Sequence, residues 1–551
     1  MNNFSNRFIQ FALICLGALL YLPFLGKVHL FDWYEINLAE SAREMLVTRD
    51  YLTIQLNFHP TFQVQPFFVW LQAISMNFFG VNEFAARLPN ALCGIITLLI
   101  VFRIGKRLID PRFGITWAFL YAASFLPFMY GKSGIADTWY DLFMFLGIYF
   151  VYEFFLTSLA RKKNHFILLS GLFVGLAVLT KGPMAIVIFL VTLLGYFAIK
   201  MFRLKVNFSH ILLFIVVLLI IGASWDLIQL VKGNFAGLRQ IVAYKYHTLS
   251  NRAAINGNFF LYHFIVLFFG VFPASIFAIR GLRYQRKDDR EPVHEFKNWM
   301  LLLFSVVLFV FTIAKAKIIY YSSLCYFPLT FMGAYVISRL QKQNLFPSWI
   351  KFLILSISII WGLFFVVFQL VIINKLNFAG STLSHYQWIS KVINSNAHGS
   401  FVGLITGLLF VGLISLLVLP KNITASLRIN SVIFLVLIFN YVQLYIYAPV
   451  VEQITQGPMI SFYLQKKTEN CYVSSLGIRG FAHLFYTNRQ LPSNIQSLQN
   501  RWLLTGDIDK PAYFVFKKAN GEKILSQYPD LEVTGSDSEY VYAYRRVLDS
   551  Q

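Results

Sequence analysis

Three acidic residues have the setting that proton chemistry requires. Asp32 and Glu35 lie directly after the first apolar run, in the stretch Phe31–Met45, and Asp137 follows a later apolar run. A carboxylate beside a hydrophobic wall is a common acid or base, because the wall changes its affinity for protons. We therefore take Asp32, Glu35 and Asp137 as the catalytic candidates.

Cationic, amide and hydroxyl side chains recur at the ends of other apolar runs. Cations hold a phosphate, and an acid can take a proton from an acceptor hydroxyl. This combination fits an anionic, lipid-linked substrate; the alternative is that these residues simply belong to solvated loops. The candidate binding residues are Gln63, Arg87, Lys132, Lys181, Lys315, Lys317, Tyr320 and Tyr321.

The residues after Glu35 have the spacing of a short helix. One face is apolar and the other is charged, which is typical of a helix lying on a membrane surface. The alternative is a solvated helix whose charges only orient it, and for Glu40 and Glu44 we favour that alternative. The apolar face is Leu38, Ala42, Met45 and Leu46, and the charged face is Glu40, Arg43 and Glu44.

The composition indicates a polytopic α-helical membrane protein. The chain has 551 residues, of which 57% are hydrophobic and 13% charged, and spanning-length apolar runs recur along it. The net charge of +22 comes largely from basic residues in short loops, where they set topology, so we do not expect nucleic-acid binding. The four Cys do not suggest a disulfide framework. We interpret Phe8–Leu25 as a span rather than a cleaved signal peptide.

Loop charges predict the topology. Arg7 places the N-terminus in the cytoplasm, and Lys106 with its basic neighbours marks the next cytoplasmic loop. One span must join the first outer loop to that cluster, and we assign it to Asn90–Ile104. The apolar run Phe67–Phe79 is then a juxtamembrane or re-entrant helix on the outer side. The alternative, an ordinary span, would invert everything after it.

The same rule applied to the remaining runs gives about thirteen spans and leaves the C-terminus outside. Few ionisable residues fall in the middle of these spans, which disfavours a transporter. The expected spans are Phe8–Leu25, Asn90–Ile104, Gly114–Tyr130, Leu142–Phe155, Phe166–Leu179, Ala185–Ile199, Ile211–Leu230, Phe259–Ala278, Met300–Ile313, Leu324–Ser338, Phe352–Ile372, Phe401–Leu419 and Val432–Tyr447.

The chain divides into two domains, a transmembrane domain over residues 1–450 and a more polar domain over residues 451–551. In the second domain, Ala512–Phe516 and Tyr540–Tyr544 have the alternation of strands, and Arg479–Tyr486 is expected to be a short helix. We therefore expect a small α/β domain on the outer face. Its sequence shows no nucleophile elbow, phosphate loop or metal cluster.

Several segments together carry a resemblance to a known family. The chain resembles the membrane glycosyltransferases of the C superfamily (GT-C), in the bacterial branch related to protein mannosyltransferases and lipid A aminoarabinose transferases. The matching segments are Glu35–Met45, Trp70–Gln72, Phe79–Pro89, Leu179–Pro183 and Lys317–Tyr321.

The resemblance implies a fold, an activity and a location. The expected fold has about thirteen spans, juxtamembrane helices in the first outer loop and a C-terminal outer domain. The expected activity is transfer of a sugar from a polyprenyl phosphate carrier to an acceptor at the outer face of the bacterial inner membrane. The implied partners are membrane lipid and a polyprenyl phosphate-linked sugar. No cofactor is indicated with certainty, and a divalent metal is left open.

The chain departs from the family at two chemically important positions. Tyr34 stands where the family carries its catalytic Asp, and a phenol with a pKa of about 10 stays protonated at neutral pH. Val64 stands where the family usually has a Lys on the carrier phosphate, and it offers neither charge nor donor. Asp137 does match a second acidic position of the family.

Two hypotheses follow from these departures. In the first, the chain is a working transferase with Asp32, Glu35 or Asp137 as a displaced base and Lys315 or Lys317 on the phosphate. In the second, it is an inactive member that serves as a lipid-binding or scaffold subunit of a membrane protein complex. The double loss favours the second hypothesis for chemistry, while the glycosyltransferase assignment stands for the family.

Overall fold

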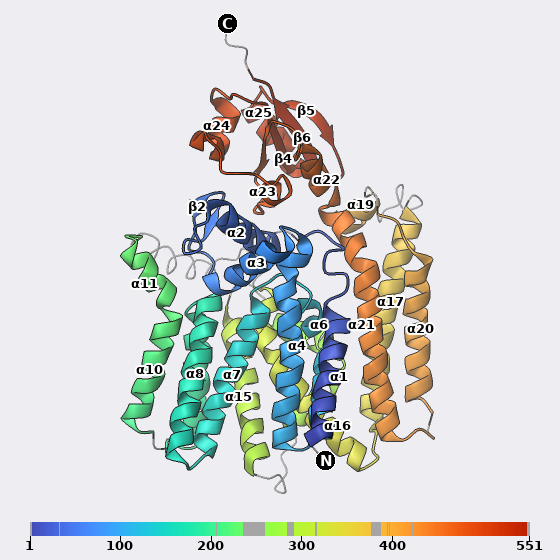
Figure 1. Ribbon diagram of the computed structural model, residues 1–551. Helices are drawn as coiled ribbons and strands as arrows, with labels where there is room; N and C mark the ends of the chain where they lie inside the picture. The colour runs from blue at the N-terminus through green and yellow to red at the C-terminus, as the bar shows by residue number, and fades with distance from the viewer. Residues whose placement is uncertain are drawn as a thin grey trace.

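A computed structural model shows a bundle of long helices capped at one end by a small α/β domain (Figure 1). Among the described residues, seven helices are long and apolar enough to cross a membrane, and a bent helix pair adds an eighth. The chain is thus a multi-pass helical protein, while the count of thirteen spans remains a prediction. The structure describes residues 3–31, 33–204, 206–234, 259–283, 291–314, 317–375, 387–393, 395, 397–420 and 422–547. The seven helices are α4 (Glu83–Leu108), α7 (Asp137–Leu156), α8 (Ala160–Lys181), α15 (Glu291–Ile313), α17 (Ser348–Ile373), α20 (Phe401–Val418) and α21 (Ala425–Thr455).

Shorter helices lie over the remaining predicted spans, and one further short helix, α19, lies between the predicted spans 352–372 and 401–419. The predicted span over residues 211–230 is a pair, α10 and α11, bent by 55°. On α8, Gly171 and Gly175 let α10 approach closely: a Cβ at Gly175 would lie 2.9 Å from Cβ of Ile221. These helices are α1 (Asn3–Tyr21), α5 (Pro111–Ala123), α6 (Phe125–Tyr130), α9 (Met184–Ile199), α10 (Phe208–Gly222), α11 (Ser224–Val231), α13 (Tyr262–Gly270), α14 (Ala274–Arg283), η1 (Ile319–Cys325), α16 (Tyr326–Lys342) and α19 (Gln387–Ile393).

The segment between α1 and α4, which is the predicted first outer loop, forms a layer between the bundle and the α/β domain (Figure 1). It holds α2 (Tyr34–Thr48), the short hairpin of β1 (Gln55–Leu56) and β2 (His59–Pro60), and α3 (Pro66–Phe79). Helix α3 begins with Pro66, whose fixed φ suits a first helical position, and it packs against both α2 and α4. The helix thus lies in the layer between the bundle and the α/β domain, and its juxtamembrane placement stays a prediction.

The expectation of a solvated charged face on α2 is wrong. Glu40, Arg43 and Glu44 are all fully buried, because the C-terminal domain covers this face. The guanidinium of Arg43 donates to both carboxylate oxygens of Glu40 at 2.7 Å and to the backbone oxygen of Arg489 at 2.7 Å. A helix that looks surface-exposed in sequence is therefore the centre of the interface between the two domains.

The C-terminal domain contains a four-stranded sheet in the order β3-β4-β6-β5. Strands β3 and β4 are parallel, and the other pairs are antiparallel. Both predicted strands are confirmed as β4 and β6, and the predicted helix over residues 479–486 is confirmed in its second half as α23. The elements are α22 (Gly457–Lys466), β3 (Tyr472–Leu476), α23 (Ala482–Tyr486), η3 (Ile495–Leu498), α24 (Asn500–Thr505), β4 (Ala512–Lys517), η4 (Lys518–Asn520), α25 (Gly521–Gln527), β5 (Glu532–Ser536) and β6 (Tyr540–Arg545).

Alternate residues of this sheet face two separate cores. Val473 and Val515 pack in the core shared with α2, α22 and α23, whereas Leu476, Phe514 and Phe516 pack in the core beneath α24 and α25. This alternation is the period of two that strands impose. One face of the sheet thus holds the domain on α2, and the other face builds the outer part of the molecule.

Candidate functional site

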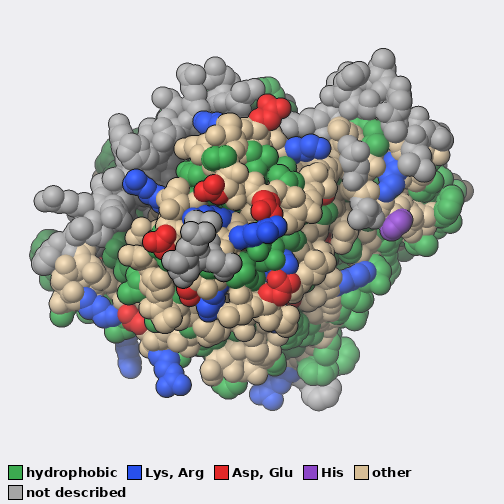
Figure 2. Space-filling model, turned by 90° about the horizontal axis from the view of Figure 1, so that it is seen from above, with side chains coloured by type: hydrophobic (Ala, Val, Ile, Leu, Met, Phe, Trp, Pro, Cys, Tyr) green, Lys and Arg blue, Asp and Glu red, His purple; other side chains and the backbone are tan. Residues whose placement is uncertain are grey.

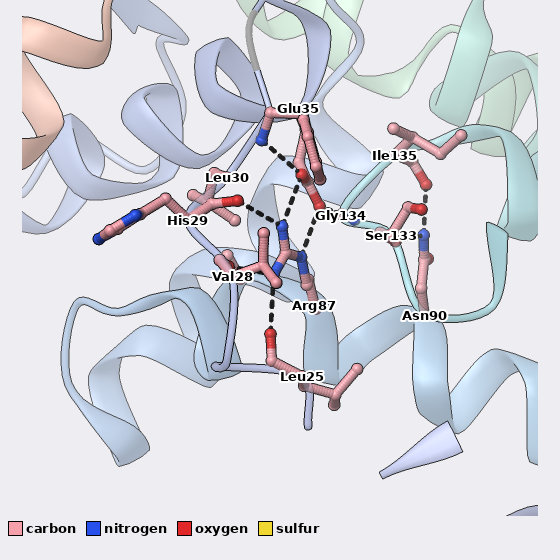
Figure 3. A network of polar contacts seen from close by, with 12 residues as sticks. Leu25, Val28, His29, Leu30, Glu35, Arg87, Asn90, Ser133, Gly134 and Ile135 are labelled. Atoms are coloured by element: carbon pink, nitrogen blue, oxygen red, sulfur yellow. Dashed lines mark hydrogen bonds and ion pairs between the residues drawn. The ribbon is translucent and has the colours of Figure 1, made fainter. Parts of the chain in front are cut away.

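Glu35 and Arg87 form a buried ion pair at the base of the outer layer (Figure 3). Nε and Nη2 of Arg87 lie 2.8 and 2.9 Å from the two carboxylate oxygens of Glu35. The same carboxylate accepts the backbone N–H groups of Phe31 and Gly134, at 2.8 and 2.5 Å. Arg87 also donates to three carbonyls of residues 25–29. The pair therefore fixes the entry into α2 against α4 and the segment before α7.

This network makes Glu35 an anchor and leaves it poorly suited to act as a base. Burial alone would raise the pKa of Glu35, but the charge and hydrogen bonds of Arg87 and the two backbone donors outweigh it, so the pKa is lowered. A carboxylate with a lowered pKa and four donors has little tendency to accept another proton. The contacts of Glu35 hold the first turn of α2, which begins at Tyr34.

A second buried ion pair joins Asp137, at the start of α7, to Lys181, at the end of α8. Asp137 is fully buried, and about a fifth of the Lys181 side chain is exposed. Three tyrosine rings surround the ammonium group of Lys181, whose Nζ lies 5.2 Å from the ring centre of Tyr140, 5.3 Å from Tyr320 and 5.7 Å from Tyr321. Aromatic faces of this kind hold a cation without neutralising it.

Lys181 lies at the polar part of a mainly apolar pocket of about 320 Å³, named the Lys181 pocket. Its polar lining comes from the segment between α1 and α4, from α7 and α8, and from η1, and its apolar wall comes largely from α9 and α15. The lining includes Trp33, Tyr34, Asn37, Gln63, Val64, Tyr140, Lys181, Met184, Val187, Ile188, Phe311, Tyr320 and Tyr321. A single cation at the end of an apolar wall suits an amphiphile with an anionic head.

A second pocket of about 590 Å³ lies on the other side of Tyr34 and is named the Lys132 pocket. Tyr34 and Tyr320 line both pockets, and their rings stack with centres 5.2 Å apart. The tyrosine pair therefore forms the partition between the two pockets. The second pocket is lined by Phe24, Lys27, Val28, Phe31, Glu35, Arg87, Met129, Tyr130, Lys132, Trp361, Phe365, Tyr441, Gln443, Tyr445 and Tyr447, among others.

Tyr34 also connects the partition to the Asp137–Lys181 pair. Its hydroxyl group lies close enough to the Asp137 carboxylate to stabilise the negative charge of that group. Asp137 thus interacts with an ammonium group on one side and a phenol on the other. A hydroxyl group between a pocket and a buried carboxylate can pass a proton from one to the other, because it both accepts and donates.

The structure brings together five of the predicted residues and separates others. Asp137, Lys181, Tyr320, Tyr321 and Gln63 gather at the Lys181 pocket. Arg87 belongs instead to the Glu35 anchor, at the border of the Lys132 pocket. Asp32 and Lys315 lie outside the described residues.

The ammonium groups of two predicted lysines donate hydrogen bonds to backbone carbonyls. Nζ of Lys317 donates to the carbonyls of Phe311, Thr312 and Ala314 at 2.7–3.2 Å, so its three hydrogens cap the end of α15. Nζ of Lys132 contacts three carbonyls at the end of α1 in the same way. The structure therefore does not bring Lys317 to the Lys181 pocket.

Sequence reasoning missed Lys27 and Tyr140. Lys27 follows the first span directly, and its Nζ lies 3.2 Å from the ring centre of Tyr445. Tyr140 lies three residues after Asp137, on the same face of α7, a helical spacing that could have revealed it. In the described part of the chain, no three His, Cys, Asp or Glu side chains gather as a metal site would require.

Comparison with known proteins gives one family and a set of relatives. Residues 59–225 match the family described as dolichyl-phosphate-mannose-protein mannosyltransferase. The chain is 26% identical over 342 residues to an undecaprenyl phosphate-alpha-4-amino-4-deoxy-L-arabinose arabinosyl transferase of Edwardsiella ictaluri, which covers 61% of this chain and 60% of that protein. A protein of the same name from Pectobacterium carotovorum is 27% identical over 334 residues, 60% of this chain and 59% of that protein. The chain thus aligns with about three fifths of the length of these relatives.

The fold extends the similarity over nearly the whole chain. The crystal structure of ArnT from Cupriavidus metallidurans bound to undecaprenyl phosphate covers 98% of both chains with a TM-score of 0.74 and 16% identity. The apo structure of the same protein gives a TM-score of 0.75 with 17% identity, covering 98% of this chain and 99% of that one. The chain thus has the fold of ArnT over nearly its whole length, and its sequence is similar to the protein mannosyltransferase family in residues 59–225 and to arabinosyl transferases over about three fifths of the chain.

Proposed function

We propose that the chain transfers a sugar from a polyprenyl phosphate carrier to an acceptor at the outer face of the bacterial inner membrane. One observation carries the proposal: the Tyr34–Tyr320 partition stands between two pockets, and the Asp137–Lys181 pair lies beside it. Two substrates that must meet need two binding spaces with the reactive groups between them. The C-terminal domain is then periplasmic, and the basic loops are cytoplasmic.

The Lys181 pocket suits the carrier. The apolar wall of α9 and α15 accommodates an isoprenoid chain, and Lys181 lies where a phosphate would meet it. The structure of ArnT bound to undecaprenyl phosphate supports a carrier of this type. Lys181 takes the role that the family gives to a Lys at the position of Val64. An ammonium group binds phosphate as a point charge, so it can do so from a different element.

The Lys132 pocket suits the acceptor, and Tyr34 connects it to the base. The acceptor oxygen attacks the anomeric carbon, and the bond from that carbon to the phosphate oxygen breaks with its electrons going to the phosphate. The acceptor proton passes to the oxygen of Tyr34, whose own proton passes to Asp137. Once Asp137 is protonated, Lys181 is released from its counter-ion and stabilises the phosphate that leaves. Tyr34 here relays a proton and never needs to be a phenolate at rest.

A second candidate function is carrier binding without transfer. It is favoured by Val64, which lines the Lys181 pocket and supplies no second contact to a phosphate. In this case the protein would hold a polyprenyl phosphate lipid within a membrane protein complex. The two candidates share the pocket and differ only in turnover.

The test is a comparison of binding and turnover in purified protein in lipid nanodiscs. Undecaprenyl phosphate binding is followed by native mass spectrometry, and turnover by release of sugar from polyprenyl-linked sugars extracted from the native host. We expect Lys181→Met to weaken lipid binding, whereas Asp137→Asn and Tyr34→Phe keep binding and lose turnover by about 10²–10⁴-fold. Lys200→Met and Glu295→Gln are matched controls, because they break an ion pair of the same type between α9 and α15.

Each outcome assigns the function. Binding that depends on Lys181 together with turnover that depends on Asp137 supports the transferase. Binding that depends on Lys181 without turnover in any extract supports the second candidate. Carrier binding that is unchanged by Lys181→Met would show that the Lys181 pocket is not the carrier site, which contradicts both candidate functions.

A further inference from the structure

A hollow opens at the outer end of the C-terminal domain, where the parallel strands β3 and β4 end. It has a volume of about 560 Å³ and is named the Arg501 pocket. Gly477 follows β3 directly and has φ of 69°, a left-handed conformation that suits glycine. A Cβ there would approach the side-chain nitrogen of Asn520, beyond the end of β4, to 3.5 Å. The carboxyl ends of two neighbouring parallel strands therefore form one wall of the hollow.

The chain leaves these two strands toward opposite faces of the sheet. After β3 it enters α23, which packs in the core shared with α2, and after β4 it enters α25, which packs in the outer core. In open sheets, a crevice at the carboxyl ends of strands whose connections diverge is the usual place for a ligand. The hollow thus has the topology of a binding site as well as its size.

The lining of the hollow is polar and basic. Arg501 and Lys523 supply two positive charges, and no acidic side chain stands among the described residues that line it. Neither side chain forms an ion pair with a described residue. The excess of positive charge is local to the pocket, because Lys, Arg, Asp and Glu side chains are intermixed over the domain seen from above (Figure 2).

Uncharged groups complete the lining. Asn500 is held to the end of β3, since its side chain accepts from Ser474 at 2.6 Å and donates to the carbonyl of Ser475 at 3.2 Å. Leu504 and Ile524 form an apolar floor. Further amide and hydroxyl groups come from Thr505, Asn520, Gln527 and Tyr528. Amides, hydroxyls and an apolar floor are what a saccharide ring uses, and the two cations suit a phosphate.

We infer that the Arg501 pocket binds a phosphorylated saccharide. The site lies in the C-terminal domain, apart from the Lys181 and Lys132 pockets, and it does not depend on sugar transfer by the membrane domain. It would let the outer domain recognise a sugar phosphate, free or as the exposed group of a larger glycan. The cations bind the phosphate, and the amides select the saccharide.

The test uses the full chain in nanodiscs and saturation-transfer difference NMR, with glucose 6-phosphate, glucose and inorganic phosphate as probes. We expect saturation transfer to glucose 6-phosphate, partial competition by inorganic phosphate, and little transfer to glucose. Arg501→Gln/Lys523→Gln should weaken glucose 6-phosphate binding by about tenfold or more, because two charge-assisted contacts are lost. Lys467→Gln/Arg546→Gln removes the same charge outside the pocket and should leave binding unchanged, with equal thermal midpoints showing that both variants fold.

Two results would overturn the inference. Equal binding of glucose and glucose 6-phosphate would exclude a role for the two cations, and full competition by inorganic phosphate at equal concentration would exclude a role for the saccharide. Loss of the signal in Lys181→Met, with no loss in Arg501→Gln/Lys523→Gln, would place the probe in the membrane domain instead. The outcome is separate from turnover, so failure of the proposed transferase leaves this test intact.

Discussion

At the scale of single residues, the Glu35–Arg87 and Asp137–Lys181 ion pairs have different environments. Glu35 and Arg87 border the Lys132 pocket, but their polar atoms are taken up by each other and by backbone groups, and Arg87 joins Leu25, Val28 and His29 to the carboxylate. The Asp137–Lys181 pair instead lies beside a pocket and a phenol. The first arrangement resists any change of charge, and the second can accept one. This difference is why we assign structure to Glu35 and chemistry to Asp137.

The Glu35 anchor makes a prediction about stability. Arg87→Met would leave the buried Glu35 carboxylate without its cation, and breaking a buried pair from one side costs about 3–5 kcal/mol. We expect a large fall in the thermal midpoint in detergent. The double variant Glu35→Leu/Arg87→Met should recover part of it, because no charge is then left buried. Arg103→Met is the control: Arg103 lies on the same helix but is exposed, and among the described residues its side chain bonds only to Gln10. Equal midpoints for Arg87→Met and Arg103→Met would contradict the anchor.

At the scale of elements, η1 depends on the cap that ends α15. Lys317 holds three carbonyls of that turn, and Tyr320 and Tyr321 follow directly on η1. We expect Lys317→Met to lower the thermal midpoint, since each carbonyl left unpaired costs about 1–3 kcal/mol. Undecaprenyl phosphate binding per folded molecule should change far less than in Lys181→Met. The reverse pattern, with normal stability and lost binding, would show that Lys317 contacts the phosphate.

Helix α2 carries a buried carboxyl group, Glu44, whose pKa is raised. Arg43 pairs with Glu40, and among the described residues Glu44 forms no ion pair and accepts the backbone N–H of Phe58 at 2.8 Å. Burial, together with the nearby Glu40, raises the pKa of Glu44 to about 9. The unfolded chain, with an ordinary pKa of about 4.3, has already lost this proton at neutral pH.

The raised pKa of Glu44 predicts a pH dependence of stability. Between pH values of about 4.3 and about 9, the folded state holds one proton more than the unfolded state, so rising pH favours unfolding. The slope is at most about 1.4 kcal/mol per pH unit. Glu44→Gln keeps the neutral form and should remove this part, so its advantage in thermal midpoint over the wild type should grow from pH 5 to pH 8. Glu522→Gln, on an exposed residue of α25, should show no such trend. An advantage that shrinks with pH would mean that Glu44 is charged in the folded state.

At the scale of the whole molecule, features that depend on neighbouring residues could be predicted from the sequence. Features that depend on contacts between distant residues could not. The apolar runs, strands β4 and β6, and the helix over residues 66–79 could be predicted because their signals are local. The burial of Arg43 could not, because its partner carbonyl belongs to Arg489, 446 residues away. Asp137 and Lys181 were each recognisable as candidates, but their pairing depends on how α7 packs on α8. The capping role of Lys317 depends on the backbone geometry at the end of α15, which the sequence pattern does not encode.

The orientation of the molecule in the membrane gives the last prediction. Lys106 and Arg107 are in the last turn of α4, while the C-terminal domain caps the opposite end of the bundle (Figure 1). Basic residues that flank spans are retained in the cytoplasm, so Glu469 should be periplasmic and Lys106 cytoplasmic. In a variant without the four native Cys, an impermeant maleimide should label Glu469→Cys in intact cells and Lys106→Cys only after permeabilisation. The two cysteine variants serve as controls for each other, because the introduced cysteine of each must react with the maleimide in permeabilised cells. Labelling of Lys106→Cys in intact cells would invert the topology and place both pockets beside Tyr34 on the cytoplasmic side, where a carrier exposed at the outer face could not reach them.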